Sequence, residues 1–201
     1  MRVLVACEYS GTVRDAFLRR GHDVMSCDLL PTDKEGPHYQ GSVLDILHDG
    51  WDLMVAHPPC THLAVSGAAH FARKIASGEQ QEALDFVRAL LDAPIPRIAL
   101  ENPVSIISSK IRKPDQIIQP HNFGHDASKQ TCIWLKGLPL LRPTQYVEPR
   151  IVITPSGKPA KRWANQCDNY GHDSQSPSPD RWKIRSATYQ GIADAMADQW
   201  G

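Results

Sequence analysis

The chain has 201 residues, of which 41% are hydrophobic and 22% are charged, and its formal net charge is zero. This composition predicts one soluble domain over residues 1–201, and the lack of a long apolar run or a signal peptide favours a cytoplasmic protein without membrane contact. The five cysteines are odd in number and widely spaced, which argues against a disulfide framework.

The first half of the sequence alternates strand-like and helix-like patterns. A short apolar run at residues 3–6 predicts a buried strand, and the turn Ser10-Gly11-Thr12 leads into a helix that ends near Gly21. Residues 23–27 predict a second strand, which ends at Asp28. This alternation is typical of a parallel sheet with crossover helices.

The same alternation continues to about residue 103. Residues 51–56 predict a strand that ends at His57-Pro58-Pro59-Cys60. A helix is predicted over residues 79–93, and Pro94 and Pro96 end it before a strand at residues 97–100. Further on, residues 131–135 predict one more strand, 165–180 a loop and 191–200 a helix. We expect residues 142–180 to form a small, loop-rich insertion for substrate recognition.

Several polar side chains follow the predicted strands directly. Open α/β sheets bind ligands beyond the carboxyl ends of their strands, so we expect the turn at Gly11, Asp28, Cys60 and Glu101 to converge. Gly11 permits the close approach of an adenosine-bearing cofactor, and Asp28 offers acceptors for ribose hydroxyls. Many Rossmann-like domains share these two features, but the dinucleotide motif G-x-G-x-x-G is absent, which counts against a dehydrogenase.

Cys60 is the strongest candidate for a reactive group. Stiff prolines precede it and a loop of small residues follows, so the thiol is expected to be exposed and held in place, as a nucleophile must be. The alternative is a buried structural cysteine, which is the commoner case. Glu101 is a candidate partner for proton transfer, and the alternatives for it are a helix cap or an ion pair.

These motifs resemble those of the cytosine-5 DNA methyltransferases. Tyr9-Ser10-Gly11 is similar to the turn that contacts S-adenosylmethionine, Pro59-Cys60-Thr61 to the nucleophile loop, and Glu101-Asn102-Pro103 to the Glu-Asn-Val motif. Residues 185–196 are similar in character to the last conserved segment. The resemblance implies a Rossmann-like S-adenosylmethionine-dependent methyltransferase fold of the α/β class, with a mostly parallel sheet and helices on both faces.

The resemblance also implies roles for individual residues in the transfer of a methyl group to carbon 5 of cytosine in DNA. Cys60 attacks carbon 6 of the ring while Glu101 holds nitrogen 3. The implied catalytic residues are Cys60, Glu101, Pro59 and Asn102; the cofactor-binding residues are Tyr9, Ser10, Gly11, Thr12, Asp28, Asp45 and Pro58; the substrate-binding residues are Thr61, His62, Ser66, Lys129, Lys161 and Arg162.

The sequence departs from the family pattern at several places. Thr61 and Pro103 replace a glutamine and a valine, Gly41-Ser42 replaces a Gly-Asp pair whose task Asp45 is a candidate to take, and Lys129 stands where arginines are expected. The length leaves no room for a large target-recognition domain. A free pyrimidine nucleotide such as dCMP is therefore an alternative substrate, and a catalytically silent nucleic-acid-binding module is an alternative function.

Basic residues are concentrated in one part of the sequence. Residues 110–162 hold ten lysines and arginines against three acidic residues, which suits either phosphate binding or a solvated surface. Aromatic residues at the end of this segment are candidates to stack on bases or to anchor a loop: Trp163, Tyr170 and Trp182.

A zinc site is a further alternative, built from His57, Cys60 and His62 with Cys132, Cys167 or His172. Nothing in the sequence indicates an obligate protein partner.

Overall fold

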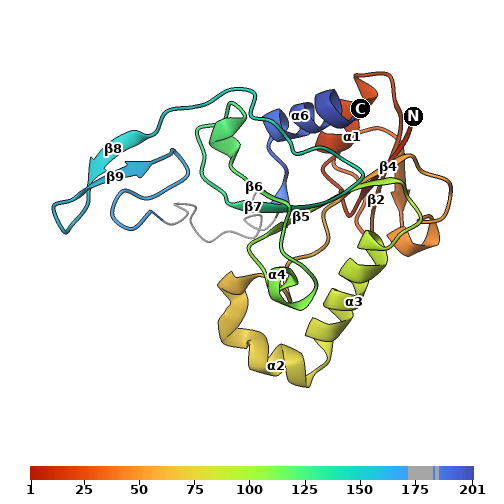
Figure 1. Ribbon diagram of the computed structural model, residues 1–201, viewed down its shortest axis with the longest axis horizontal. Helices are drawn as coiled ribbons and strands as arrows, with labels where there is room; N and C mark the ends of the chain where they lie inside the picture. Colours follow the sequence, from red (N-terminus) through yellow and green to blue (C-terminus); the bar gives the residue numbers. More distant parts are fainter. Residues whose placement is uncertain (172–182, 184–185) are drawn as a thin grey trace.

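The computed structural model describes residues 1–171, 183 and 186–201 (Figure 1). Its main sheet has seven strands in the order β3-β2-β1-β4-β5-β7-β6. β1 to β5 run parallel, whereas β7 lies antiparallel between β5 and β6. None of the helices in these described ranges combines the length and apolarity that crossing a bilayer would require.

The strands and helices have the following bounds, given in chain order. The strands of the main sheet are β1 (Arg2–Ala6), β2 (Asp23–Asp28), β3 (His38–Gln40), β4 (Leu53–Ala56), β5 (Arg97–Pro103), β6 (Gln116–Ile118) and β7 (Thr131–Lys136). The α-helices are α1 (Thr12–Leu18), α2 (Phe71–Ala76), α3 (Glu79–Leu91), α4 (Ile107–Lys110) and α6 (Gln190–Trp200). Short 3₁₀ helices lie at Val43–Asp45, Val65–His70 and Pro120–Asn122.

Helices cover both faces of the sheet, as the sequence predicted (Figure 1). Successive side chains of a strand point to opposite faces, so Val3 and Val5 of β1 pack with α1 and α6, whereas Leu4 and Ala6 pack on the side of α3. β1 and β4 carry buried apolar side chains on both faces of the sheet, which is typical of central parallel strands. The helix expected at residues 191–200 is confirmed as α6.

The predicted strands are all present, but one boundary was wrong in a way that affects the site. The strand expected to end at Leu100 continues to Pro103, and Glu101 therefore lies inside β5 opposite Ile133 of β7. The apolar run alone did not show this, because the antiparallel partner β7 supplies the hydrogen bonds that keep residues 101–103 extended. The three-residue strands β3 and β6 were not predicted, since so few residues show no periodicity.

A separate two-stranded hairpin lies within the segment expected to be loop-rich. Its strands are β8 (Arg150–Ile153) and β9 (Pro159–Arg162), and it projects away from the main sheet (Figure 1). Trp163 follows β9 and stacks on the His121 ring at 4.0 Å between centroids, so this aromatic residue anchors the hairpin. Trp182 and His172, named above as candidates, lie outside the described residues.

Candidate active site

The site lies where the strand order of the sheet reverses. β1 sits between β2, which follows it along the chain, and β4, from which the chain continues in the other direction to β5. Ligands of such sheets bind in the crevice beyond the carboxyl ends of the two central strands. Here residues 7–12 follow β1 and residues 57–66 follow β4, so the predicted cofactor turn and the predicted nucleophile loop flank this crevice.

The turn after β1 is organised by Glu8, a residue that sequence reasoning missed. Its carboxylate accepts hydrogen bonds from the Val13 N–H at 2.6 Å, the Arg14 N–H at 3.2 Å and the Ser10 hydroxyl at 3.2 Å. Gly11 precedes α1 with a φ of 70°, in the left-handed region that favours glycine. Because the Glu8 carboxylate is hydrogen-bonded to the backbone N–H groups at the start of α1, these groups are not available to bind a phosphate. An acidic residue just before a glycine turn and a helix was the available signal.

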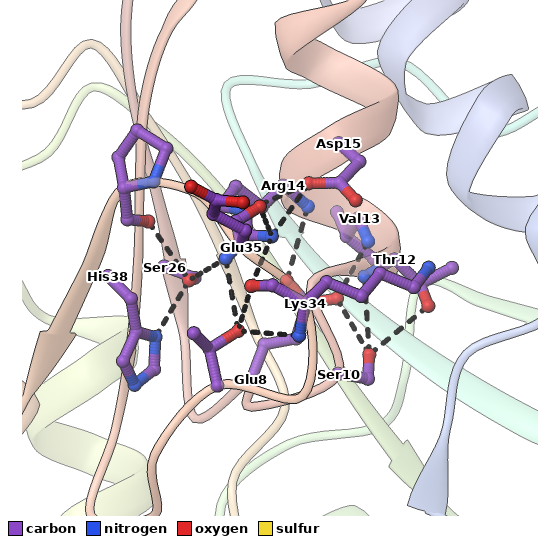
Figure 2. Close-up of polar contacts among 12 residues, drawn as sticks. Glu8, Ser10, Thr12, Val13, Arg14, Asp15, Ser26, Lys34, Glu35 and His38 are labelled. Carbon is purple, nitrogen blue, oxygen red and sulfur yellow. Dashed lines mark hydrogen bonds and ion pairs between the residues drawn. The ribbon is translucent and has the colours of Figure 1, made fainter.

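A second missed residue, Arg14, fastens the connection between β2 and β3 over this turn (Figure 2). Its guanidinium is fully buried and donates to the carbonyls of Lys34 and Glu35, both at 3.1 Å. The Asp33 N–H donates to the Tyr9 carbonyl at 2.8 Å, which ties the same connection to the predicted cofactor turn. An arginine beside the buried face of a short helix is hard to recognise in a sequence, because surface arginines are far commoner.

We expect Arg14→Ala to lower the free energy of unfolding by about 3 kcal/mol, since it removes several buried hydrogen bonds and leaves carbonyls without donors. Arg19→Ala is the matched control, because the exposed Arg19–Asp194 ion pair near the end of the same helix contributes less than about 1 kcal/mol. Urea denaturation of both variants measures the difference. Equal stability of the two variants would contradict the role given to Arg14.

The other predicted cofactor residues lie around the same turn. Tyr9 is buried, and its hydroxyl lies 2.9 Å from the Ser186 hydroxyl. Asp28 ends β2 and accepts a hydrogen bond from the Leu30 N–H at 2.9 Å. Asp45 is exposed and accepts from the Tyr39 hydroxyl at 3.2 Å. Thr12 starts α1.

The loop that carries Cys60 is fastened to the end of β5. Buried Asn102 donates from its side-chain amide to the Pro58 carbonyl at 2.9 Å, and the Val65 N–H donates to the Val104 carbonyl at 3.1 Å. The Cys60 carbonyl accepts from two amides downstream, which closes a tight turn, while Pro59 is exposed. The Cys60 side chain is half-buried and so is not sealed in the core.

Three of the other cysteines lie in surroundings that raise the pKa of the thiol. Cys27 is buried, and burial together with the charges of Asp28 and Asp45 raises its pKa to about 12. Burial likewise raises the pKa of Cys132, with a further contribution from the charge of Glu101. Burial and the charge of Asp28 raise the pKa of Cys7, whose φ of 58° also marks a strained backbone at the end of β1. These three thiols are poor nucleophiles at neutral pH.

Glu101 is hydrogen-bonded to His57, a contact that becomes an ion pair when His57 is protonated, while its part in proton transfer stays a prediction. The distance from His57 Nδ1 to Glu101 Oε2 is 2.8 Å, and the two side chains are 10% and 13% exposed. Burial alone raises the pKa of Glu101, but the hydrogen bond and charge of His57, together with the charge of Lys129, outweigh it and hold the pKa below its usual range. Glu101 is therefore ionised at neutral pH.

The predicted substrate residues are only partly brought together. Lys129 lines a small cavity with Glu101 and with Tyr189 at the start of α6. Thr61 and Ser66 are exposed on the Cys60 loop, and the Thr61 carbonyl accepts a hydrogen bond from the buried Lys74.

The His62 side chain is partly buried on the same loop, and its carbonyl accepts from the Gln80 amide at 3.4 Å. Lys161 and Arg162 lie on the hairpin, in the separate sheet. Asn165, three residues after the hairpin, exchanges two hydrogen bonds with the backbone of Ser128, the neighbour of Lys129, at 2.8 and 2.9 Å.

The residues weighed for zinc do not gather in the described part of the chain. Across residues 1–171, 183 and 186–201, no three His, Cys, Asp or Glu side chains are grouped so that they could hold a metal ion. A cavity of about 690 Å³ lies elsewhere, between Arg88 of α3 and Lys136 at the end of β7, and none of the predicted site residues line it.

The fold of this chain is similar to that of two solved methyltransferase structures. The chain matches no family model and no curated relative in sequence. A protein assigned as a DNA modification methyltransferase encoded within an E. coli prophage is 15% identical, with a TM-score of 0.50 over 73% of this chain and 52% of that chain. The methyltransferase EhMeth of Entamoeba histolytica is 16% identical, with a TM-score of 0.51 over 74% of this chain and 58% of that chain.

The fold predicted from the sequence is therefore confirmed. The mostly parallel sheet with helices on both faces is a Rossmann-like fold, which this chain shares with these two methyltransferase structures. The chain spans little more than half the length of these two structures.

Proposed function

We propose that this protein transfers a methyl group from S-adenosylmethionine to carbon 5 of cytosine in DNA through a covalent adduct with Cys60. One observation carries the proposal: on a methyltransferase fold, the Cys60 loop is hydrogen-bonded to the residue that directly follows Glu101. Asn102 thus couples the position of the predicted nucleophile to that of the predicted base-binding carboxylate.

The charges around the turn after β1 fit this cofactor. Glu8 is buried there, and Asp28 lies at the end of the neighbouring strand. The Glu8 carboxylate occupies the start of α1 and repels a pyrophosphate there, so the turn suits a cofactor with a cationic centre and no phosphate, while Asp28 offers acceptors for ribose hydroxyls. S-adenosylmethionine meets both conditions, and when bound it supplies a methyl group on a positively charged sulfur.

The residues of the chain supply the rest of the chemistry. The Cys60 thiolate forms a bond to carbon 6 of cytosine, and the electron pair of the 5,6 double bond moves toward carbon 5, which becomes nucleophilic. Glu101, at nitrogen 3, stabilises the altered ring. After carbon 5 has taken the methyl group, its proton passes to water; the electron pair of that C–H bond re-forms the 5,6 double bond, and Cys60 leaves as a thiolate.

DNA presents its bases in a stack, so the target base has to leave the duplex to reach Cys60, at a cost of a few kcal/mol. We propose that the hairpin contributes to binding the DNA around that base. Lys158 and Lys161 are exposed on it and face solvent, where they can neutralise phosphates. Asn165 and Ser128 connect its base to the segment next to Lys129.

Methyl transfer from labelled S-adenosylmethionine to DNA, RNA and free dCMP tests this proposal. We expect label in DNA, at carbon 5 of cytosine, and binding to DNA that weakens steeply as salt rises. Transfer to dCMP alone would replace DNA by a free nucleotide as the substrate. A protein that binds DNA but not S-adenosylmethionine would be a silent nucleic-acid-binding module, and the proposal would fail.

A further inference from the structure

His57 contacts Glu101 and lies three residues before Cys60 in the sequence, and none of the roles above uses its side chain. It follows β4 directly, its backbone N–H donates to the Ala6 carbonyl at 2.9 Å, and its Nδ1 lies 2.8 Å from Glu101. Its other ring nitrogen, Nε2, is buried and has no hydrogen-bond partner among the described residues. A buried polar atom without a partner is costly, so its position beside the loop of the predicted nucleophile points to a function.

Several titratable side chains lie around the pair of His57 and Glu101. Lys129 acts on the Glu101 carboxylate through its charge, and Cys132 of β7 has its pKa raised by burial and by that carboxylate. Tyr189 borders the same cavity from the start of α6, and Cys60 follows on the loop of His57 itself. Among these groups His57 has a hydrogen bond to the carboxylate, at 2.8 Å from Nδ1 to Oε2, and an imidazole can both donate and accept a proton through its ring nitrogens.

We propose that His57 is a positioning residue that orients Glu101 and supplies it with the proton that nitrogen 3 of the base receives. This inference rests on the proposed function. An ionised Glu101 accepts hydrogen bonds but has no proton to give, whereas the electron-rich ring formed by thiolate attack needs one at nitrogen 3. A protonated His57 beside the carboxylate resolves this conflict, because the pair together holds the required proton.

The step is balanced in protons and charge. As the sulfur–carbon 6 bond forms, the N–H bond at Nδ1 of the imidazolium breaks, Glu101 relays one proton, and an N–H bond forms at nitrogen 3. His57 becomes neutral and Glu101 remains a carboxylate. The same proton returns to His57 when Cys60 leaves and the aromatic ring re-forms.

His57→Asn tests the role, because the asparagine amide can still donate to Glu101 but cannot release a proton. We expect the rate constant kcat for transfer at pH 7 to fall about 100-fold, with the KM for S-adenosylmethionine unchanged. The wild-type rate should decline as the pH rises and the pair loses its proton, and this decline should vanish in the variant. His48→Asn, at an exposed histidine, is the control. A wild-type rate and pH profile in His57→Asn would overturn the inference.

A second measurement needs no methyl acceptor. In NMR spectra at a fixed pH near neutrality, Glu101→Gln should lower the ratio of charged to neutral His57 imidazole about tenfold, since the carboxylate no longer stabilises the cation. An unchanged ratio would overturn the inference even where methyl transfer is established. If the His57 ratio changes tenfold but no acceptor is methylated, the proposed function is wrong, and so is the delivery of the proton to nitrogen 3. The coupling between His57 and Glu101 would then still hold.

Discussion

Replacing Cys60 with serine should abolish methyl transfer while S-adenosylmethionine still binds. A hydroxyl is a far weaker nucleophile than a thiolate at neutral pH, so we expect the rate to fall by at least about three orders of magnitude. The cofactor turn lies after β1 and Cys60 lies after β4, so the substitution leaves the contacts of Glu8 and Arg14 unchanged. Single-turnover transfer of label and calorimetric titration with the cofactor measure the two effects separately.

Cys167→Ser is the matched control, because Cys167 is also partly exposed but lies beyond the hairpin. It should retain the wild-type rate. Mass spectrometry of the wild-type protein with DNA that contains 5-fluorocytosine should show a covalent complex, since fluorine at carbon 5 cannot leave as a proton does. Full activity of Cys60→Ser, or a complex that persists in it, would disprove the assignment of the nucleophile.

Replacing Glu101 with glutamine should slow transfer by about 10²–10⁴-fold, the range typical of losing a general acid or base. Glutamine preserves the size of the side chain and an oxygen that accepts from His57, so the loss of rate reports on charge and proton transfer. The low pKa of Glu101 also means that the ion pair stabilises the folded state at neutral pH. That contribution persists down to the pKa of an unfolded glutamate and is lost as the pH falls through the lower folded value.

Glu82→Gln, on the exposed side of α3, is the control for a generic loss of negative charge. Thermal unfolding at pH 7 and at pH 3 should show a difference between wild type and Glu101→Gln that is smaller at the acidic pH. Wild-type kinetics in Glu101→Gln would exclude the carboxylate from the chemistry, whatever its effect on stability.

Much of the fold could be predicted because its signals are local. The apolar runs of β1, β4 and β5 and the helical spacing in α3 and α6 lie within short windows of sequence. β3, β6 and the hairpin strands β8 and β9 escaped prediction, since they are short and are held by pairing with distant residues. The same reason explains the misplaced end of β5, which β7 extends from thirty residues further along the chain.

The candidate site divides in the same way. Cys60 and Glu101 could be picked out from the sequence because each follows an apolar run, and parallel strands carry their ends to one edge of the sheet. Glu8 left a weak signal, an acid before a glycine turn, whereas Arg14 and His57 could not be picked out, because their roles depend on partners 21 and 44 residues away in the sequence. An acid, an arginine and a histidine are most often surface residues, and their patterns alone do not distinguish the buried cases.

The sequence by itself determined the order of the longer strands and helices and the candidate nucleophile, since periodicity and local motifs depend only on neighbouring residues. Only the tertiary structure decided which polar groups meet: the carboxylate that occupies the start of α1, the guanidinium that closes the turn, and the histidine that pairs with Glu101. Most of these hydrogen bonds join residues that are far apart in the sequence, so they form only when the whole sheet is assembled. A buried polar group without a hydrogen-bond partner is costly, and this cost selects the arrangement in which each group has its partner.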